Sequence, residues 1–125
     1  MASAHPAPLA AEGHTLSKAT LRAAALLGLA QAELAPVLGL SPATISRMAA
    51  GEHVLAPRQK SWELAVLFVR LFRSLDAVVG SNDSQARAWF DSENLALGGV
   101  PRQLIVKAEG LVRAVQYLDA ARGRI

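Results

Sequence analysis

Between Ser41 and Arg47 the chain places three hydroxyl groups and one guanidinium group within seven residues. An arginine can pair bidentately with guanine, and a threonine offers a hydroxyl and a methyl group to a base edge. On a helix that begins near Ser41, these side chains project from the exposed early turns. The segment therefore predicts a DNA-reading surface in which Thr44 and Arg47 contact base edges. The other members of this surface are Ser41, Pro42, Ala43 and Ser46.

The surrounding residues are typical of a helix-turn-helix running from Gln31 to Glu52. Gly39 can take the left-handed conformation that ends a first helix, and Ser41 followed by a proline is a favourable start for a second. Gly51 then supplies a stop. The second helix would lie in the major groove, and Gln31 would contact a phosphate. The expected shared core consists of Leu34, Leu38, Leu40, Ile45 and Met48, with a small Ala35 where the helices cross.

Two residues oppose a regular first helix in this motif. Ala30 has no side-chain oxygen to cap the helix, which costs about 1 kcal/mol, and Pro36 in a helix interior costs about 3 kcal/mol. We therefore expect the first motif helix to start late or to kink near Pro36. The alternative interpretation is a helical hairpin in a small all-α domain, whose Thr and Arg side chains only solvate an outer face.

Net charge supports DNA binding only modestly. The chain carries +3, made up of +2 over residues 1–60 (five basic, three acidic) and +1 over residues 61–125 (eight basic, seven acidic). So few cations give weak phosphate binding, and we expect two copies side by side, a homodimer or a larger assembly, on operator DNA.

Composition excludes several other classes of protein. The 125 residues contain no cysteine, so disulfides and thiolate metal sites are ruled out, and His5, His14 and His53 are too scattered for a metal site. No metal or other cofactor is expected, and a reducing cytoplasm fits. Residues 1–14 include an Ala- and Pro-rich stretch without a basic start, which predicts a flexible arm rather than a secretion signal.

The stretch from Ser61 to Val79 predicts a helix that is apolar nearly all round. Arg70, Arg73 and Asp76 interrupt it and would be costly in a bilayer, so no membrane association is expected. Two interpretations stay open for its second apolar side. The helix is either a central core helix satisfied within one chain, or part of a dimer or partner interface.

The second half combines a short helix over 85–90, a Gly98-Gly99-x-Pro101 turn and a last amphipathic helix over 107–122. The motif made by Ala86-Arg-x-Trp-Phe90, Asn94, Leu97-Gly-Gly-x-Pro-x-x-Leu-Ile105 and Glu109-Gly110 resembles the toxin-binding domain of the Xre/MbcA/ParS antitoxins. The helix-turn-helix in front completes that family's usual order. Leu95 stands where the family pattern has a proline, and one residue rather than two separates Gly99 from Pro101.

This resemblance implies an antitoxin for a RES-domain toxin, an enzyme that consumes NAD or uses it to ADP-ribosylate a target. Arg122 and Arg124 would lie near the toxin's NAD pocket and compete for sites that hold NAD phosphates. The implied toxin-binding residues are Trp89, Asn94, Leu97, Gly98, Gly99, Pro101, Arg102, Tyr117, Arg122 and Arg124. For Trp89 and Tyr117 the alternative is core packing, and for the two arginines it is a solvated terminus.

These observations predict an all-α chain with an arm over 1–14, a helix-turn-helix domain over 15–60 and a toxin-binding domain over 61–125. The expected function is toxin inhibition combined with repression of the protein's own operon. The alternative is a stand-alone transcriptional regulator whose second half dimerises. An enzyme is not expected, because the chain has no Cys, no Gly-rich phosphate loop and no His beyond His53 within the predicted folded region to pair with Ser or Asp.

Overall fold

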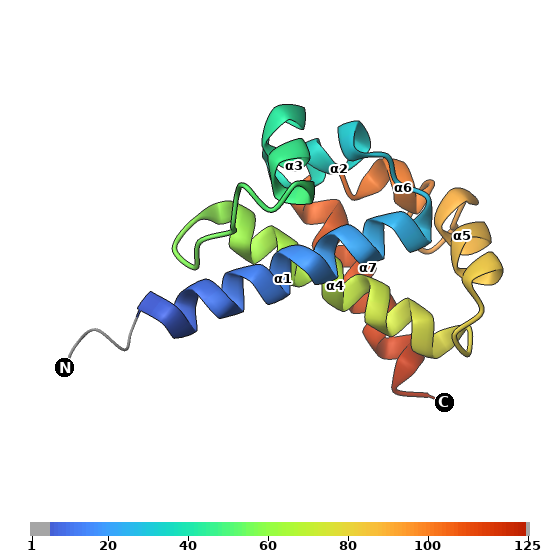
Figure 1. Cartoon of the computed structure of the whole chain (residues 1–125). Helices are drawn as coiled ribbons and strands as arrows, with labels where there is room; N and C mark the ends of the chain where they lie inside the picture. The colour runs from blue at the N-terminus through green and yellow to red at the C-terminus, as the bar shows by residue number, and fades with distance from the viewer. Residues whose placement is uncertain (1–5, 125) are drawn as a thin grey trace.

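The computed structural model describes the backbone of residues 6–124 and the side chains of residues 11–124. Within that range the chain is all-α, as expected, and its only β pairing is an isolated bridge between Asn94 and Gly99. No helix in the described range is both long and apolar enough to cross a membrane. The helices are α1 (Pro6–Leu27), α2 (Gln31–Leu38), α3 (Pro42–Ala49), α4 (Lys60–Val78), α5 (Asp83–Asp91), α6 (Pro101–Leu104) and α7 (Ala108–Arg122) (Figure 1).

Helices α4 and α7 pack together through the centre of the molecule, and α1 lies across α4 (Figure 1). The buried side chains form one continuous cluster that includes residues of every helix except α6. Its fully buried large members come from both halves of the sequence, so the two halves share a single core. They are Leu27, Leu34, Leu38, Ile45, Leu55, Phe68, Leu71, Leu75, Phe90, Ile105, Leu111 and Leu118.

The predicted flexible arm is wrong for residues 6–14, because α1 already begins at Pro6; residues 1–5 lie outside the described residues. A proline in the first turn of a helix forfeits no intrahelical hydrogen bond, and the alanines that follow favour helix. Gly13 is buried, and a Cβ there would lie 2.6 Å from the Leu55 carbonyl oxygen. The missing side chain therefore lets α1 lie directly against the segment that precedes α4.

Helices α2 and α3 lie within the predicted helix-turn-helix segment Gln31–Glu52, but α2 does not start late. It begins at Gln31, where the Glu33 side chain accepts a hydrogen bond from the Ala30 backbone N–H at 2.9 Å. This is the half of a capping box that needs no N-cap side chain, because it satisfies the N–H of Ala30 itself. Pro36 lies inside α2 on an exposed position, and its neighbours Ala35 and Val37 are buried. Tertiary burial thus offsets the local cost of the proline.

The ends of α2 and α3 use the residues that the sequence singles out. Gly39 ends α2 in the left-handed conformation, with φ of 68°. Ser41 caps α3, since its hydroxyl oxygen accepts a hydrogen bond from the Thr44 backbone N–H at 3.1 Å. Pro42 then occupies the first helical position. These local signals fix the turn between the two helices.

Helix α4 contacts α1, α2, α5 and α7, so most of its apolar surface is satisfied within the chain. Phe68, Leu71 and Leu75 are fully buried. An exception is Val66, which is 45% exposed. Both interpretations of this helix therefore keep a physical basis, because it is a central core helix and the described residues leave Val66 on it uncovered.

Candidate functional site

Three predicted DNA-reading residues form a hydrogen-bonded row along α3. The hydroxyls of Ser41 and Thr44 lie 2.9 Å apart, and the Arg47 guanidinium donates to the Thr44 hydroxyl at 3.1 Å. Because Thr44 is itself held by the cap of α3, it restrains Arg47 along the helix face. Gln31 and Ser46 are exposed and contribute no side-chain hydrogen bond to this row within the described residues.

The row suits DNA readout because its polar groups lie on the exposed side of α3, whereas Ile45 and Met48 on the same helix are buried. A restrained arginine loses less side-chain entropy when it pairs with a base than a free one does. The arrangement provides one donor fork and two hydroxyls on a single helix face, which is the donor and acceptor set that a major groove can accept.

Asn94 organises the loop between α5 and α6. Its carbonyl oxygen accepts hydrogen bonds from the backbone N–H groups of Gly98 and Gly99, and its side-chain oxygen accepts one from the Leu97 N–H at 3.0 Å. Gly98 has φ of 79°, a conformation that favours glycine. Asn94 and Gly98 therefore shape the loop, and the Leu97 side chain and Pro101 are buried beneath it.

Leu95 lies in the same loop and is 92% exposed. Burying a leucine side chain is worth about 1.5–3 kcal/mol, so this residue is a candidate anchor for a protein partner. Sequence reasoning noted Leu95 only as a departure from the family pattern. The signal that could have identified it is an isolated large apolar residue beside a glycine-rich turn.

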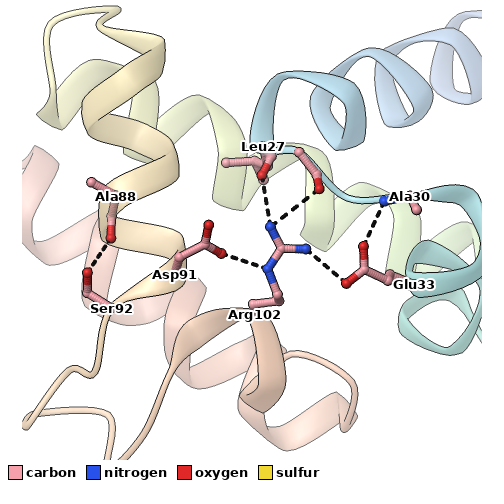
Figure 2. Close-up of polar contacts among 8 residues, drawn as sticks. Leu27, Ala30, Glu33, Ala88, Asp91, Ser92 and Arg102 are labelled. Atoms are coloured by element: carbon pink, nitrogen blue, oxygen red, sulfur yellow. Dashed lines mark hydrogen bonds and ion pairs between the residues drawn. The ribbon is translucent and has the colours of Figure 1, made fainter.

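Arg102, at the start of α6, points back into the molecule rather than outward (Figure 2). Its guanidinium contacts Asp91 of α5 at 2.6 Å and Glu33 of α2 at 3.0 Å. It also donates to the carbonyl oxygens of Leu27, the last residue of α1, and of Gly28, at 3.4 and 3.3 Å. The side chain is only 23% exposed. Its predicted direct contact with a toxin stays a prediction.

The groups around Arg102 stabilise its positive charge. The hydrogen bond with Asp91 raises the pKa of the guanidinium above its usual value, with Glu33 contributing in the same direction. The guanidinium carbon also lies 5.2 Å from the centre of the Phe90 ring, a cation–π distance. Carbonyl groups at a helix C-terminus favour a cation as well. Arg102 therefore joins α1, α2, α5 and α6 at one point.

Trp89 of α5 and Tyr117 of α7 stack, with ring centres 6.3 Å apart and ring planes inclined by 22°. Both side chains are half-buried and pack against the core cluster. The structure thus brings two predicted toxin-binding residues together in a partly exposed aromatic pair. Packing between helices accounts for this pair, and its outer edges stay open to solvent.

At the end of α7, Asp119 ties the helix to α4. Its carboxylate accepts hydrogen bonds from the Ser74 hydroxyl at 2.7 Å and from Arg70 at 2.8 and 2.9 Å. These bonds, that from Ser74 foremost, lower the pKa of Asp119 below its ordinary value. Arg122 donates to the Ser74 hydroxyl at 3.4 Å, whereas Arg124 is exposed. Sequence reasoning missed Asp119 and Ser74 as a contact because they are 45 residues apart.

A groove of about 700 Å³ is lined by residues of α1 and α4 and by Arg122. Its α1 wall carries Glu12, and its α4 wall carries Arg70 and Arg73. We call this feature the α1/α4 groove. Its apolar lining consists of Ala11, Leu16, Ala19, Trp62, Val66 and Val69. In the described part of the chain, no group of three His, Asp or Glu side chains is placed to hold a metal ion.

The fold and these surfaces define a two-part all-α protein in which a helix-turn-helix and a second helical module share one central helix. Residues 7–70 match the antitoxin Xre-like helix-turn-helix domain. Residues 74–124 match the antitoxin Xre/MbcA/ParS C-terminal toxin-binding domain. The chain belongs to the Xre/MbcA/ParS antitoxins, and neither matched domain is a catalytic family.

A solved structure shows the same fold. It is the crystal structure of the M. tuberculosis MbcT-MbcA toxin-antitoxin complex, of which one chain is 22% identical to this one. The match covers 88% of this chain and 96% of that chain, with a TM-score of 0.64. No curated protein matches the sequence.

Proposed function

We propose that this antitoxin binds and sterically inhibits a RES-domain toxin that consumes NAD or uses it to ADP-ribosylate a target, and that it represses its own operon. The observation that carries the proposal is the presence of both family domains on one shared core. On this proposal the chain acts by binding and has no catalytic activity of its own.

The toxin-binding surface runs from the loop at Leu95 to the end of α7. Leu95 supplies an exposed apolar anchor, and the Trp89–Tyr117 pair supplies aromatic area. Arg122, the last residue of α7, and Arg124, two residues further on, add two exposed cations that can occupy the phosphate sites of the toxin's NAD pocket. Asp119 supports this role because it fixes the last turns of α7 against α4.

Operator binding is assigned to the row on α3. Thr44 and Arg47 read base edges, and Gln31, Ser41 and Ser46 contact the backbone or flanking bases. The low net charge makes binding by a single copy weak, so the proposal includes a homodimer.

A second copy of this chain is the occupant we propose for the α1/α4 groove. Glu12 on one wall and Arg73 on the other form no ion pair with another described residue, so each is available to an opposite charge of a second copy. In the dimer we propose, a two-fold axis through the groove would pair Glu12 of each copy with Arg73 of the other and would cover Val66.

The dimer is tested by a charge exchange. Glu12→Arg should shift the mass measured by sedimentation equilibrium towards the monomer, because it places like charges together, and adding Arg73→Glu should restore the dimer. Lys18→Glu is the matched control, since Lys18 is exposed on α1 but does not line the groove. An unchanged mass in Glu12→Arg would exclude this surface.

The whole proposal is tested by growth and cellular NAD when the adjacent reading frame is expressed alone and then together with this chain. Growth arrest with NAD loss, both reversed by this chain, is the expected result. Growth arrest without NAD loss, also reversed, would indicate the ADP-ribosylating chemistry. A harmless neighbour, or poisoning that this chain does not relieve, would instead favour a stand-alone DNA-binding regulator.

A further inference from the structure

We propose that the α1/α4 groove binds a small amphipathic anion, a molecule with an apolar body and one carboxylate, when no second copy of the chain covers it. The inference goes beyond the proposed binding of toxin and DNA. Its basis is the size of the groove, the order of residues along its α4 wall and one arginine without a partner among the described residues. Helix α1 lies across α4 (Figure 1), and side chains of both helices line the groove.

The groove has the size and the lining of a small-molecule site. Its volume is about 700 Å³. Sites for small ligands typically measure about 300–1,000 Å³ and are lined by apolar and aromatic side chains with a few polar groups. Trp62 is half-buried and supplies the aromatic group, while Leu16 and Ala19 of α1 supply apolar ones. Val66 is 45% exposed, so an apolar ligand in the groove would remove it from water.

The α4 wall of the groove changes from apolar to cationic along the helix. Trp62, Val66 and Val69 come first, and Arg70 and Arg73 follow them in the lining. At a rise of about 1.5 Å per residue, Trp62 and Arg73 lie about 16 Å apart along the helix axis. The groove therefore has an apolar stretch and a cationic end, and an amphipathic anion has the same two parts.

Arg73 is the group that we assign to the carboxylate of the ligand. The other two arginines of the lining already have partners, since Arg70 binds Asp119 at 2.8 Å and Arg122 donates to the Ser74 hydroxyl at 3.4 Å. Arg73 is exposed and makes no side-chain hydrogen bond or ion pair with another described residue. A guanidinium can hold a carboxylate through two parallel hydrogen bonds.

The charge of the lining also favours an anion. Three arginines line the groove against one acidic side chain, Glu12, and an excess of one sign of charge in a cleft attracts ligands of the opposite sign. In the proposed dimer, Arg73 meets Glu12 of the second copy. A carboxylate ligand offers Arg73 the same chemical group, so the ligand and the second copy exclude each other.

Calorimetric titration of the full chain with octanoate tests the site, and octanol is the neutral control. Octanoate should bind saturably, and octanol should bind several-fold more weakly because it lacks the charge. In Arg73→Gln octanoate should bind about 5- to 10-fold more weakly, since its charge-assisted hydrogen bonds are lost. Lys18→Gln is the matched control and should keep the wild-type affinity, because Lys18 is exposed on α1 outside the groove.

Amide chemical shifts locate the ligand on the protein. On addition of octanoate the amides of Val66 and Arg73 should shift, whereas that of Arg47 on α3 should not. The inference is overturned if octanoate does not bind, if octanol binds equally well, if Arg73→Gln keeps the wild-type affinity, or if the shifts spare Val66 and Arg73. The titration is repeated with Glu12→Gln, which keeps Arg73 but removes the charge that would hold a second copy. Absence of binding there too cannot be ascribed to a dimer that covers the groove.

Sedimentation equilibrium separates this inference from the proposed function. Saturating octanoate should shift the measured mass towards the monomer, because a ligand that binds only the uncovered groove draws the equilibrium to that state. If octanoate binds as expected while a dimer persists, the proposed dimer surface is wrong and the ligand site stands. Since none of these measurements uses toxin or DNA, failure of toxin inhibition or of operator binding leaves the inference intact.

Discussion

At Gly110 the structure shows whether an alanine substitution raises or lowers the free energy of unfolding. Alanine favours a helix over glycine by about 0.8–1.0 kcal/mol, so Gly110→Ala inside α7 would ordinarily stabilise the protein. Here, however, a Cβ would lie 2.8 Å from the Leu104 carbonyl carbon and closer still to its oxygen. Both atoms belong to the backbone, so no side-chain rotation can relieve the contact.

The steric term outweighs the gain in helix propensity. Relief requires α6 or the start of α7 to move, and overpacking of this kind costs about 1–3 kcal/mol, occasionally more. Two neighbours of the contact, Ile105 and Leu111, are fully buried, which resists such a shift. We expect Gly110→Ala to lower the free energy of unfolding by about 2 kcal/mol after the propensity gain, a fall in Tm on the order of 10 °C.

Urea unfolding followed by circular dichroism measures this change directly. Gly123→Ala is the control, because a Cβ at Gly123 meets only ordinary contacts of 3.5 Å or more and its backbone is right-handed helical. The control should be neutral or slightly stabilising. If Gly110→Ala proves as stable as the wild type, the close approach of α7 to α6 is not what requires glycine there, and the reasoning fails.

Four further predictions concern polar side chains and the end of the chain, and each has its own assay. Because Ser74 and Arg70 lower the pKa of Asp119, this carboxylate stabilises the fold above its unfolded-state pKa of about 3.8, and the contribution is lost as the pH falls through the lower folded-state value. The urea midpoint of Asp119→Asn should therefore fall less steeply below about pH 4 than that of the wild type; parallel curves would contradict this. Arg47→Ala should weaken operator binding in an anisotropy titration by about 1–3 kcal/mol, roughly 5- to 160-fold, without affecting toxin binding, and loss of both in a folded variant would refute the assignment. Deleting residues 122–125 should abolish protection against the toxin but leave operator binding intact; a truncated chain that still protects would disprove occlusion by the tail. Ser41→Ala should cost about 1 kcal/mol in urea unfolding, and Ser46→Ala, which removes an exposed hydroxyl, should not.

The parts that could be predicted from the sequence are those fixed by local chemistry. Ser41 and Gly39 set the boundaries of α2 and α3 through contacts within a few residues, and such contacts leave a direct signal in residue type and spacing. The Gly98-Gly99 turn behaves likewise, since Asn94 closes it from nearby in the chain. The family resemblance draws on the same short-range features.

The features that could not be predicted depend on distant residues. Arg102 and Glu33 are 69 positions apart, and nothing in either segment alone indicates that they meet. The helical residues before His14 were missed for a related reason. The composition of an Ala- and Pro-rich stretch predicts a flexible segment. The close contact that requires glycine at position 13 is made by Leu55, far along the chain.

Helix α4 shows why the two modules cannot be treated as independent. The family matches end at residue 70 and resume at residue 74, yet α4 continues from Lys60 to Val78 across that boundary. Ser74 on the far side of the boundary donates to Asp119 of α7, and Arg70 on the near side binds the same carboxylate. Since one carboxylate holds residues of both modules, any partner that moves α7 also acts on the helix that supports α1 and α2. The shared helix and the Arg102 contacts therefore connect the two modules physically in two places.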